Sequence, residues 1–276
     1  MPILPFAVAT VTALVLAPAL RASLAEGGFV RENYRGDPLP FPFGVAVVAA
    51  AAVALVPLAL VYAATDEPLV EDTPSVVLTF VLGVAALGLA DDALSGPSRG
   101  WRGHGAAVMK GSFSTGALKA AGSLGLAFFV LAGRYDDPGR YLLAVTVLVL
   151  ATNLFNLIDL RPGRSAKLLV LLGAGLTIGT WDAGPLAALG LLAFPALALG
   201  IYDLRERAML GDTGSNLMGA LGGLWIVLSL DTTGQLVALA LIALATVYGE
   251  FRSLGALIER TPILRQLDSF GRPTHA

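Results

Sequence analysis

The chain contains no cysteine, and only 2 of its 276 residues are histidine. The absence of cysteine excludes disulfide bonds, thiolate metal sites and a cysteine nucleophile. Charged residues are also scarce, at 14%, whereas 56% of the residues are hydrophobic and the mean hydropathy is +0.76. This composition predicts an all-α, polytopic integral membrane protein. The net charge of −2 gives no indication of nucleic-acid binding.

Nine apolar segments are candidates for membrane-spanning helices. A bilayer core of about 30 Å needs roughly 20 helical residues, and fewer where neighbouring helices cover the segment. No basic side chain precedes Arg21, so the first segment is expected to be a span rather than a removable signal peptide. The ninth is expected to continue past the membrane, because Glu250 and Arg252 enter it while an apolar stripe persists at helical spacing. The segments are approximately 2–20, 43–64, 74–90, 116–133, 141–158, 166–181, 184–202, 213–230 and 234–258.

Basic residues are distributed unevenly over the loops between these segments. With nine spans the loops alternate between two sides, and 16 of the 18 Lys and Arg residues fall on one side. Only Arg134 and Arg140 fall on the other. The positive-inside rule therefore predicts that the rich side is cytoplasmic and the N-terminus outside. We expect a single membrane-embedded domain, 1–276, in the plasma (inner) membrane, with its C-terminus and its site facing the cytoplasm.

Four acidic or amide-bearing motifs stand at the predicted cytoplasmic ends of these segments. A carboxylate at the edge of a membrane helix is a candidate ligand for a cation or a phosphate-bound metal. Because all four motifs fall on one membrane face, they can share one active site. The motifs are Asp91-Asp92, Asn153-Leu154-Phe155-Asn156, Asp159, and Gly211-Asp212-Thr213-Gly214-Ser215.

The expected helix directions distinguish the acidic residues. Asp91, Asp92 and Asp159 are expected at helix C-termini, where the negative end of the dipole disfavours an anion. Two adjacent carboxylates also repel each other, and a cation would relieve both effects. Asp212 instead begins the eighth segment, where it can serve as an N-cap. Oxygen ligands without histidine or cysteine favour Mg²⁺ or Mn²⁺ over zinc.

Each motif also has a purely structural interpretation. Asp91-Asp92 can be a solvated cluster at the membrane edge, and 211–215 can be a turn with a helix cap. Asn153, Asn156 and Asp159 recur every three residues and can face a common cavity, but the two asparagines can equally hydrogen-bond neighbouring helices. The shared placement on one membrane face favours the functional interpretation.

The order and spacing of the motifs resemble the polyprenyl-phosphate N-acetylhexosamine-1-phosphate transferases, which include the phospho-MurNAc-pentapeptide translocase and the GlcNAc-1-phosphate transferases. The resemblance covers nearly the whole chain. Lys119 falls where this family has a lysine opening its fourth span, and 35–40 is similar to a degenerate form of its first cytoplasmic loop. The strongest matches are Asp91-Asp92, Asn153-Leu-Phe-Asn156-Leu-Ile-Asp159 and Gly211-Asp212-Thr213-Gly214-Ser215.

The resemblance implies a phosphoglycosyl transferase for cell-envelope glycan synthesis, dependent on Mg²⁺ or Mn²⁺. It would move a sugar 1-phosphate of the N-acetylhexosamine type from a UDP-sugar to undecaprenyl phosphate and release UMP. By the resemblance, Asp212 and Asn156 hold the metal. Asp91 and Asp92 orient or deprotonate the lipid phosphate, and Asp159 holds or activates the donor. Further implied substrate-binding residues are Asn153, Lys119, Gly211 and Thr213.

The chain departs from the family pattern just beyond Asp159. The family usually continues Gly-Leu-Asp-Gly, whereas this chain has Leu160-Arg161-Pro162-Gly163-Arg164, so an acidic residue associated with the nucleotide base is missing. The histidine-rich segment after the ninth span is replaced by 262–266, and no tenth span follows. Basic residues near Asp159 are expected to grip the donor diphosphate instead. They are Arg161, Arg164, Lys167, Arg205 and Arg207.

Two other classes of function remain open. A transporter would more often place ionisable groups near the bilayer midplane, and a non-catalytic scaffold would not need polar motifs at three helix ends. The expected partners are a polyprenyl phosphate, a nucleotide sugar and membrane lipids, not nucleic acid. The sugar, the nucleotide and a homodimeric assembly are left open.

Overall fold

The computed structural model describes residues 3–65, 75–94 and 114–273. Within these ranges the chain is all-α apart from one small antiparallel sheet, as expected from its composition. The sheet pairs β1 (Val30–Glu32) with β2 (Pro38–Pro40). The 11 helices of the described residues are α1 (Ile3–Glu26), α2 (Val45–Thr65), α3 (Ser75–Leu94), α5 (Thr115–Leu131), α6 (Pro138–Ile158), α7 (Arg164–Thr180), α8 (Gly184–Leu204), α9 (Gly211–Ser229), α10 (Thr232–Phe251), α11 (Leu254–Arg260) and α12 (Pro262–Ser269).

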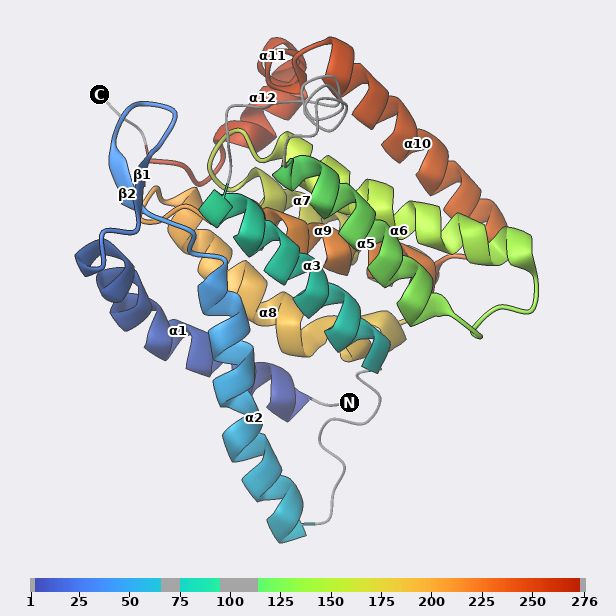
Figure 1. Ribbon diagram of the computed structural model, residues 1–276, viewed down its shortest axis with the longest axis horizontal. Coiled ribbons are helices and arrows are strands. Elements are labelled where there is room, and N and C mark those ends of the chain that lie inside the picture. The colour runs from blue at the N-terminus through green and yellow to red at the C-terminus, as the bar shows by residue number, and fades with distance from the viewer. Residues whose placement is uncertain (1–2, 66–74, 95–113, 274–276) are drawn as a thin grey trace.

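The nine long helices, α1 to α10, form a bundle in which successive helices run in opposite directions (Figure 1). Each overlaps one of the nine apolar segments of the sequence. One end of the bundle carries the β1–β2 hairpin together with α11 and α12, and we call it the hairpin end. Helices α3, α6 and α8 end there, and α5, α7 and α9 begin there (Figure 1). Of the described Lys and Arg residues, Arg134 and Arg140 alone lie at the opposite end.

Six of the described helices are long and apolar enough to cross a membrane, namely α1, α2, α3, α6, α8 and α10. This supports a multi-pass membrane protein, and it corrects the expected number of spans from nine to six by that criterion. Helices α5 and α7 have only 17 residues each, fewer than the roughly 20 that a bilayer needs. Helix α9 begins with polar residues, and its residues from Thr213 to Ile226 are all buried. Protein therefore surrounds α9, and its first turns need not be apolar.

The expected ninth segment is also corrected at its end. Helix α10 stops at Phe251, and Arg252 takes an extended conformation with φ −140° and ψ 159°. The Ser253 hydroxyl accepts the backbone N–H of Ala256 and caps a separate helix, α11. Pro262 then opens α12, where its missing N–H costs nothing. The apolar stripe continues through this region, but the N-cap serine starts a new helix.

Close contacts with α9 align the helices that carry the motifs. A Cβ atom at Gly88 of α3 would lie 2.5 Å from the carbonyl oxygen of Asp212. One at Gly219 of α9 would lie 2.7 Å from the Cα of Thr152 in α6. These glycines therefore allow the backbones of α3 and α6 to lie in close contact with the backbone of α9. This packing places the ends of α3 and α6 beside the first turns of α9.

The segment 35–40, which is similar to the first cytoplasmic loop of the family, lies in the turn and second strand of the hairpin. The Asn33 side chain accepts the backbone N–H groups of Arg35 and Asp37 at 2.8 and 3.0 Å and so closes the turn. At the end of β2, the Met209 N–H donates to the Pro40 carbonyl at 2.9 Å. The Phe43 N–H donates to the Met209 carbonyl at 2.7 Å. The hairpin is therefore held against the segment that leads into α9.

Candidate active site

Lys119 joins two carboxylates from different helices. Its Nζ lies 2.8 Å from Oδ2 of Asp91 in α3 and 2.5 Å from Oδ2 of Asp212 in α9. The side chains of Lys119 and Asp91 are only 18% and 13% exposed. In such an enclosed place the ammonium offsets the repulsion between the two carboxylates. We call these three residues the Lys119 cluster. The structure thus brings together three residues that the sequence analysis assigned to one site.

Asp92, next to Asp91, has a different environment. Its Oδ1 accepts the backbone N–H of Asp212 at 2.9 Å, and its Oδ2 accepts the N–H and the hydroxyl of Thr213 at 2.8 and 2.6 Å. Asp92 therefore caps the positive end of the α9 dipole from a neighbouring helix. Gly211 has φ +71°, and a Cβ there would lie 2.7 Å from Asp92 Oδ2. Both Asp92 and Thr213 are buried and engaged with each other rather than open to a substrate.

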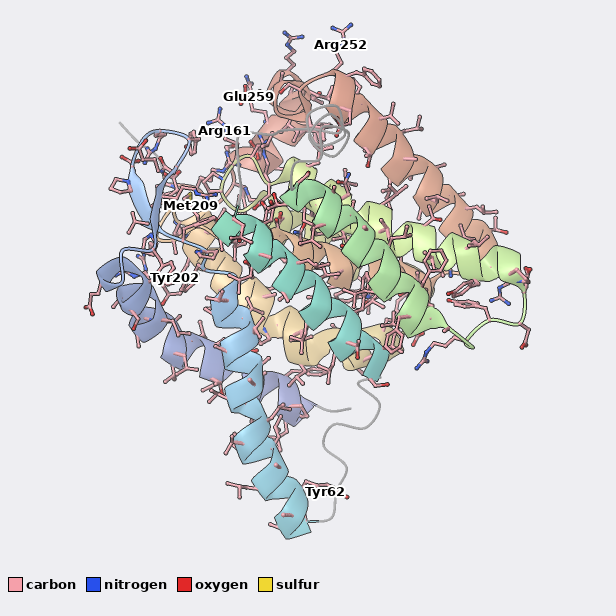
Figure 2. The ribbon with its side chains drawn as sticks, viewed as in Figure 1. Tyr62, Arg161, Tyr202, Met209, Arg252 and Glu259 are labelled. Carbon is pink, nitrogen blue, oxygen red and sulfur yellow. The ribbon has the colours of Figure 1, made fainter. Side chains whose placement is uncertain are left out.

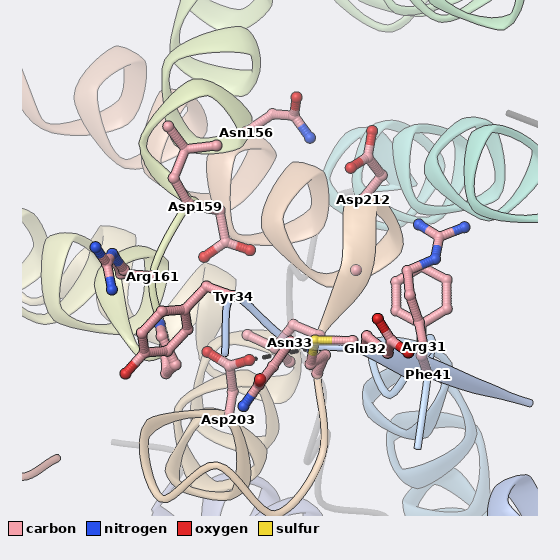
Figure 3. Close-up of a pocket in the computed structure, with 15 residues that line it drawn as sticks. Arg31, Glu32, Asn33, Tyr34, Phe41, Asn156, Asp159, Arg161, Asp203 and Asp212 are labelled. Carbon is pink, nitrogen blue, oxygen red and sulfur yellow. Dashed lines mark hydrogen bonds between the residues drawn. The ribbon is translucent and has the colours of Figure 1, made fainter. Parts of the chain in front are cut away.

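Asp212 does not cap its own helix. Leu210 occupies the N-cap position of α9 and makes no side-chain cap hydrogen bond, while Asp212 lies in the first turn. Since Asp92 already satisfies the first N–H groups, the Asp212 carboxylate is left for Lys119. Asp212 also lines a cavity beneath the β1–β2 hairpin (Figure 3).

A cavity of about 310 Å³ lies beneath the hairpin, and we call it cavity 1. Two of its arginines stand over aromatic rings: the Arg31 guanidinium is 3.9 Å from the centre of Phe41, and that of Arg161 is 4.2 Å from the centre of Tyr34. Such cations can bind an anion such as a diphosphate, and the rings offer a surface for a planar group. The cavity is also lined by Asn33, Asn156, Asp159, Asp203, Gly211 and Asp212 (Figure 3).

Asp159 and Asn156 face cavity 1 from the end of α6. Asn156 donates its amide to the Ser215 hydroxyl at 3.2 Å, and this bond orients its carbonyl oxygen. Asp159 Oδ1 accepts the Ser165 hydroxyl at 2.8 Å. Burial raises the pKa of Asp159 well above its usual value, and the nearby charge of Asp203 raises it further, although the bond from Ser165 opposes the shift. Asp159 is thus poised to hold a proton or to pair with a cation.

Asp203, in the last turn of α8, was not identified from the sequence. It is buried, and its carboxylate accepts the backbone N–H of Gly163 at 2.6 Å and that of Leu210 at 3.3 Å. Asp203 therefore ties the loop after Asp159 to the segment before α9. It belongs to no motif, but an acidic residue directly after an apolar segment, at the predicted cytoplasmic end, could have singled it out.

Of the five basic residues expected to grip the donor diphosphate, only Arg161 lines cavity 1, and Arg205 and Arg207 do not. Arg161 lines cavity 1, and it pairs with Glu259 of α11 at 3.1 Å; both lie at the hairpin end (Figure 2). Arg164 and Lys167 do not line cavity 1. Arg164 forms two bonds to the Asp268 carboxylate, at 2.8 and 3.0 Å, and Lys167 donates to the Asp268 carbonyl at 2.5 Å. These two side chains therefore hold α12.

A second arginine completes this contact. Arg272 donates to Asp268 at 2.6 Å and to the carbonyl of Pro162 at 2.9 Å. We call Arg164, Asp268 and Arg272 the C-terminal latch. Burial acts to raise the pKa of Asp268, but the hydrogen bonds and charges of both arginines outweigh it, so its pKa is lowered. The latch anchors the loop between Asp159 and α7 from the C-terminal side.

A second cavity of about 310 Å³, which we call cavity 2, lies between α5, α6, α9 and α10. Asp91 and Lys119 line it, as does Asn153. Asn156 lines both cavities, and Asp212 lines cavity 1. The two cavities therefore meet at the Lys119 cluster. Apolar walls of cavity 2 come from Ala120, Val149, Leu150 and Leu157.

The residues implied to hold a metal fit a site in which the substrate and water supply most of the ligands better than a site that the protein encloses alone. In the described part of the chain, no group of three or more His, Asp or Glu could enclose a metal ion. Mg²⁺ commonly takes only one or two protein oxygens together with substrate phosphates and water. Asp212 and Asn156 both line cavity 1, and their carboxylate and amide groups can supply two such oxygens.

No protein-family model matches the sequence, and no curated protein is significantly similar to it. What the fold and the site define is a multi-pass, all-α membrane protein with two cavities that meet at a carboxylate–lysine cluster.

Proposed function

We propose that the protein is a phosphoglycosyl transferase that moves a sugar 1-phosphate from a nucleotide sugar to a polyprenyl phosphate. The observation that carries this proposal is the meeting of two unlike cavities at the Lys119 cluster. Cavity 1 offers guanidinium, aromatic and carboxylate groups beneath the hairpin. Cavity 2 offers a lysine and apolar walls between helices. A charged donor and an amphiphilic acceptor would meet where these cavities join.

The donor is assigned to cavity 1. Arg31 and Arg161 suit a diphosphate, and the exposed ring of Tyr34 suits a nucleobase. A UDP-linked N-acetylhexosamine is the proposed donor class. The acceptor phosphate is assigned to cavity 2, where Lys119 provides a point charge and the apolar walls accommodate the first isoprene units.

In the proposed reaction an oxygen of the acceptor phosphate attacks the β-phosphorus of the donor. A new P–O–P bond forms, and the bond from the β-phosphorus to the bridging oxygen breaks, so that UMP leaves with that oxygen. Phosphoryl transfer depends mainly on positioning and charge neutralisation. Asp91 would orient or deprotonate the acceptor, and Asp159 would hold the donor. A Mg²⁺ or Mn²⁺ ion on Asp212 and Asn156 would neutralise charge on the donor diphosphate.

The contacts of Asp92 change the role proposed for it. With both carboxylate oxygens bound to the first turn of α9, Asp92 acts as a positioning residue and not as a contact for the lipid phosphate. It would fix the place of Asp212 relative to Asp91.

The hairpin end is proposed to face the cytoplasm of a cell whose plasma (inner) membrane holds the protein. The concentration of Lys and Arg at this end supports that orientation. Nucleotide sugars would then enter cavity 1 from water, and the lipid would enter cavity 2 from the bilayer.

The test is an assay of purified protein with undecaprenyl phosphate, Mg²⁺ and a panel of nucleotide sugars, with UMP and lipid product measured. We expect one or more UDP-sugars to yield both products in equal amounts. Asp212→Ala should abolish turnover, while Asp231→Ala, which alters the N-cap of α10 at the opposite end, should keep it. Absence of UMP release from every donor, with the acceptor shown to be accessible, would refute the proposal.

A further inference from the structure

The three helices that meet at the junction of the two cavities each carry a second polar residue about one turn deeper in the bundle. Residues three or four apart lie on the same face of a helix. The pairs, outer residue first, are Lys119 and Ser123 on α5, Asn156 and Asn153 on α6, and Asp212 and Asn216 on α9. We call Ser123, Asn153 and Asn216 the inner polar set. All three line cavity 2.

Two members of this set are buried without hydrogen-bond partners. Asn216 is 1% exposed, and neither its Oδ1 nor its Nδ2 has a partner. No other residue in the described segments has both polar atoms of its side chain in this state. Ser123 is 3% exposed, and its hydroxyl also lacks a partner. A buried polar group that stays unpaired destabilises the fold, so its presence needs an explanation. Both residues line cavity 2, which points to a ligand there.

The chemistry of the set indicates which ligand it fits. The Asn216 amide and the Ser123 hydroxyl can each donate a hydrogen bond, and Lys119 adds a third donor one turn away. Three donors on one wall match the oxygens of a phosphate monoester. The apolar side chains of Val149, Leu150 and Leu157 lie on the α6 side and match a hydrocarbon chain. Glu250 lines the cavity from α10, so the charge on that side disfavours an anion and places the phosphate on the side of α5 and α9.

We infer that the inner polar set is a binding subsite for the phosphate group of an isoprenoid monophosphate. Asn216 and Ser123 hold two of its oxygens and leave the third directed outward to the Lys119 cluster. The choice of an isoprenoid chain rests on the proposed function. The preference for a phosphate rests on the hydrogen-bond donors that line cavity 2. These are positioning residues, because they fix the phosphate without taking part in bond exchange.

The test is equilibrium binding of farnesyl phosphate to the purified protein, with no sugar nucleotide present. Farnesol and inorganic phosphate are the comparison probes. We expect farnesyl phosphate to bind at least tenfold more tightly than either, since only it engages both the donors and the apolar wall. Asn216→Leu should weaken its binding about tenfold, and Ser123→Ala should weaken it about threefold.

A matched control is Thr246→Val. Thr246 has a buried, unpartnered hydroxyl on α10, but it does not line cavity 2, so this variant should keep the affinity for farnesyl phosphate. Without ligand, Asn216→Leu should raise the thermal midpoint, because it replaces an unpaired amide by a side chain of similar size. A merely structural asparagine would give the opposite change in midpoint.

Unchanged affinity for farnesyl phosphate in both Asn216→Leu and Ser123→Ala would overturn the inference, and so would equal binding of farnesol. Failure of the proposed function has a separate signature. If the wild type transfers no sugar phosphate yet loses farnesyl phosphate binding on Asn216→Leu, the subsite stands and the transferase does not. If transfer proceeds and Asn216→Leu leaves the acceptor KM unchanged, the transferase stands and the subsite fails.

Discussion

The carboxylate of Asp92, near the end of α3, accepts both the backbone N–H and the hydroxyl of Thr213, in the first turn of α9, at 2.8 and 2.6 Å. Asp91, its neighbour in the chain, pairs instead with Lys119. Adjacent residues of one helix point to different faces, so the two acids have separate surroundings. Asp92 fixes α3 against α9, and this packing sets the distance between Asp91 and Asp212.

The first prediction concerns stability. Asp92→Asn should lower the free energy of unfolding by about 1–3 kcal/mol, because an amide oxygen is a weaker acceptor and its nitrogen faces N–H donors. Asp91→Asn should cost less, since Lys119 keeps its bond to Asp212. Thermal or denaturant unfolding of the purified variants measures both. Equal losses for the two substitutions would contradict the capping role of Asp92.

The second prediction concerns Lys119. Lys119→Met leaves Asp91 and Asp212 facing each other without a cation, and the rate of sugar-phosphate transfer should fall by about 100-fold or more. Lys119→Arg should retain partial activity, because its planar guanidinium keeps the charge but not the geometry. UMP release at saturating donor and Mg²⁺ gives the rate. Arg140→Met, at the opposite end of the bundle, is the control. Retention of most activity by Lys119→Met would contradict a role of the Lys119 cluster in the transfer reaction.

The third prediction concerns the C-terminal latch. Asp268→Asn leaves the guanidiniums of Arg164 and Arg272 without their shared carboxylate and should destabilise the fold by about 2–4 kcal/mol. Because the folded-state pKa of Asp268 is lowered, its stabilisation is present at neutral pH and is lost as pH falls through that pKa, below the usual value of 3.8. Hydrogen exchange across α12 should rise in the variant. Unchanged protection there would show that the latch does not hold the helix.

The fourth prediction concerns the pH dependence of stability at Asp159. Its pKa is raised in the folded state, so the folded protein binds this proton more tightly than the unfolded chain does. The resulting stabilisation is full below about pH 3.8 and is lost as pH rises through the folded pKa. Asp159→Asn cannot titrate, so its free energy of unfolding should decline less than that of the wild type from about pH 4 upward. Parallel pH profiles of the variant and the wild type would contradict a raised pKa of Asp159 in the folded protein. Asp136→Asn, in the exposed loop at the other end of the bundle, is the control.

Much of the helical framework could be predicted from the sequence, because apolar segments of roughly bilayer length mark helices directly. Each of the nine predicted segments overlaps one of the nine bundle helices. The polar residues in the first turn of α9 are explained by the protein that buries this helix and not by the composition of the segment. The criterion failed after Phe251, where an apolar stripe continues through the break between α10 and the helix that Ser253 caps.

The candidate site could be predicted less completely, because partners distant in sequence decide what each polar residue does. Asp91 and Asp92 are indistinguishable in the sequence, and only the approach of α9 separates their roles. Arg164 was expected to meet a substrate, but its partner is Asp268, 104 residues away. The membrane-edge motifs predicted at which end of the bundle the candidate site lies, and the tertiary contacts decide the environment of each side chain.

The most direct measurement follows the β-phosphorus of the donor. Purified protein is given undecaprenyl phosphate, Mg²⁺ and UDP-N-acetylglucosamine, or whichever UDP-sugar is active in the panel, with separate labels on the β-phosphate and the sugar. If the sugar 1-phosphate is transferred intact to the lipid, both labels should enter the lipid in equal amounts, and UMP should be the only released nucleotide. Asp212→Ala should transfer neither label. Sugar label in the lipid with the β-phosphate left in UDP, or no transfer from any donor, would contradict the proposed function.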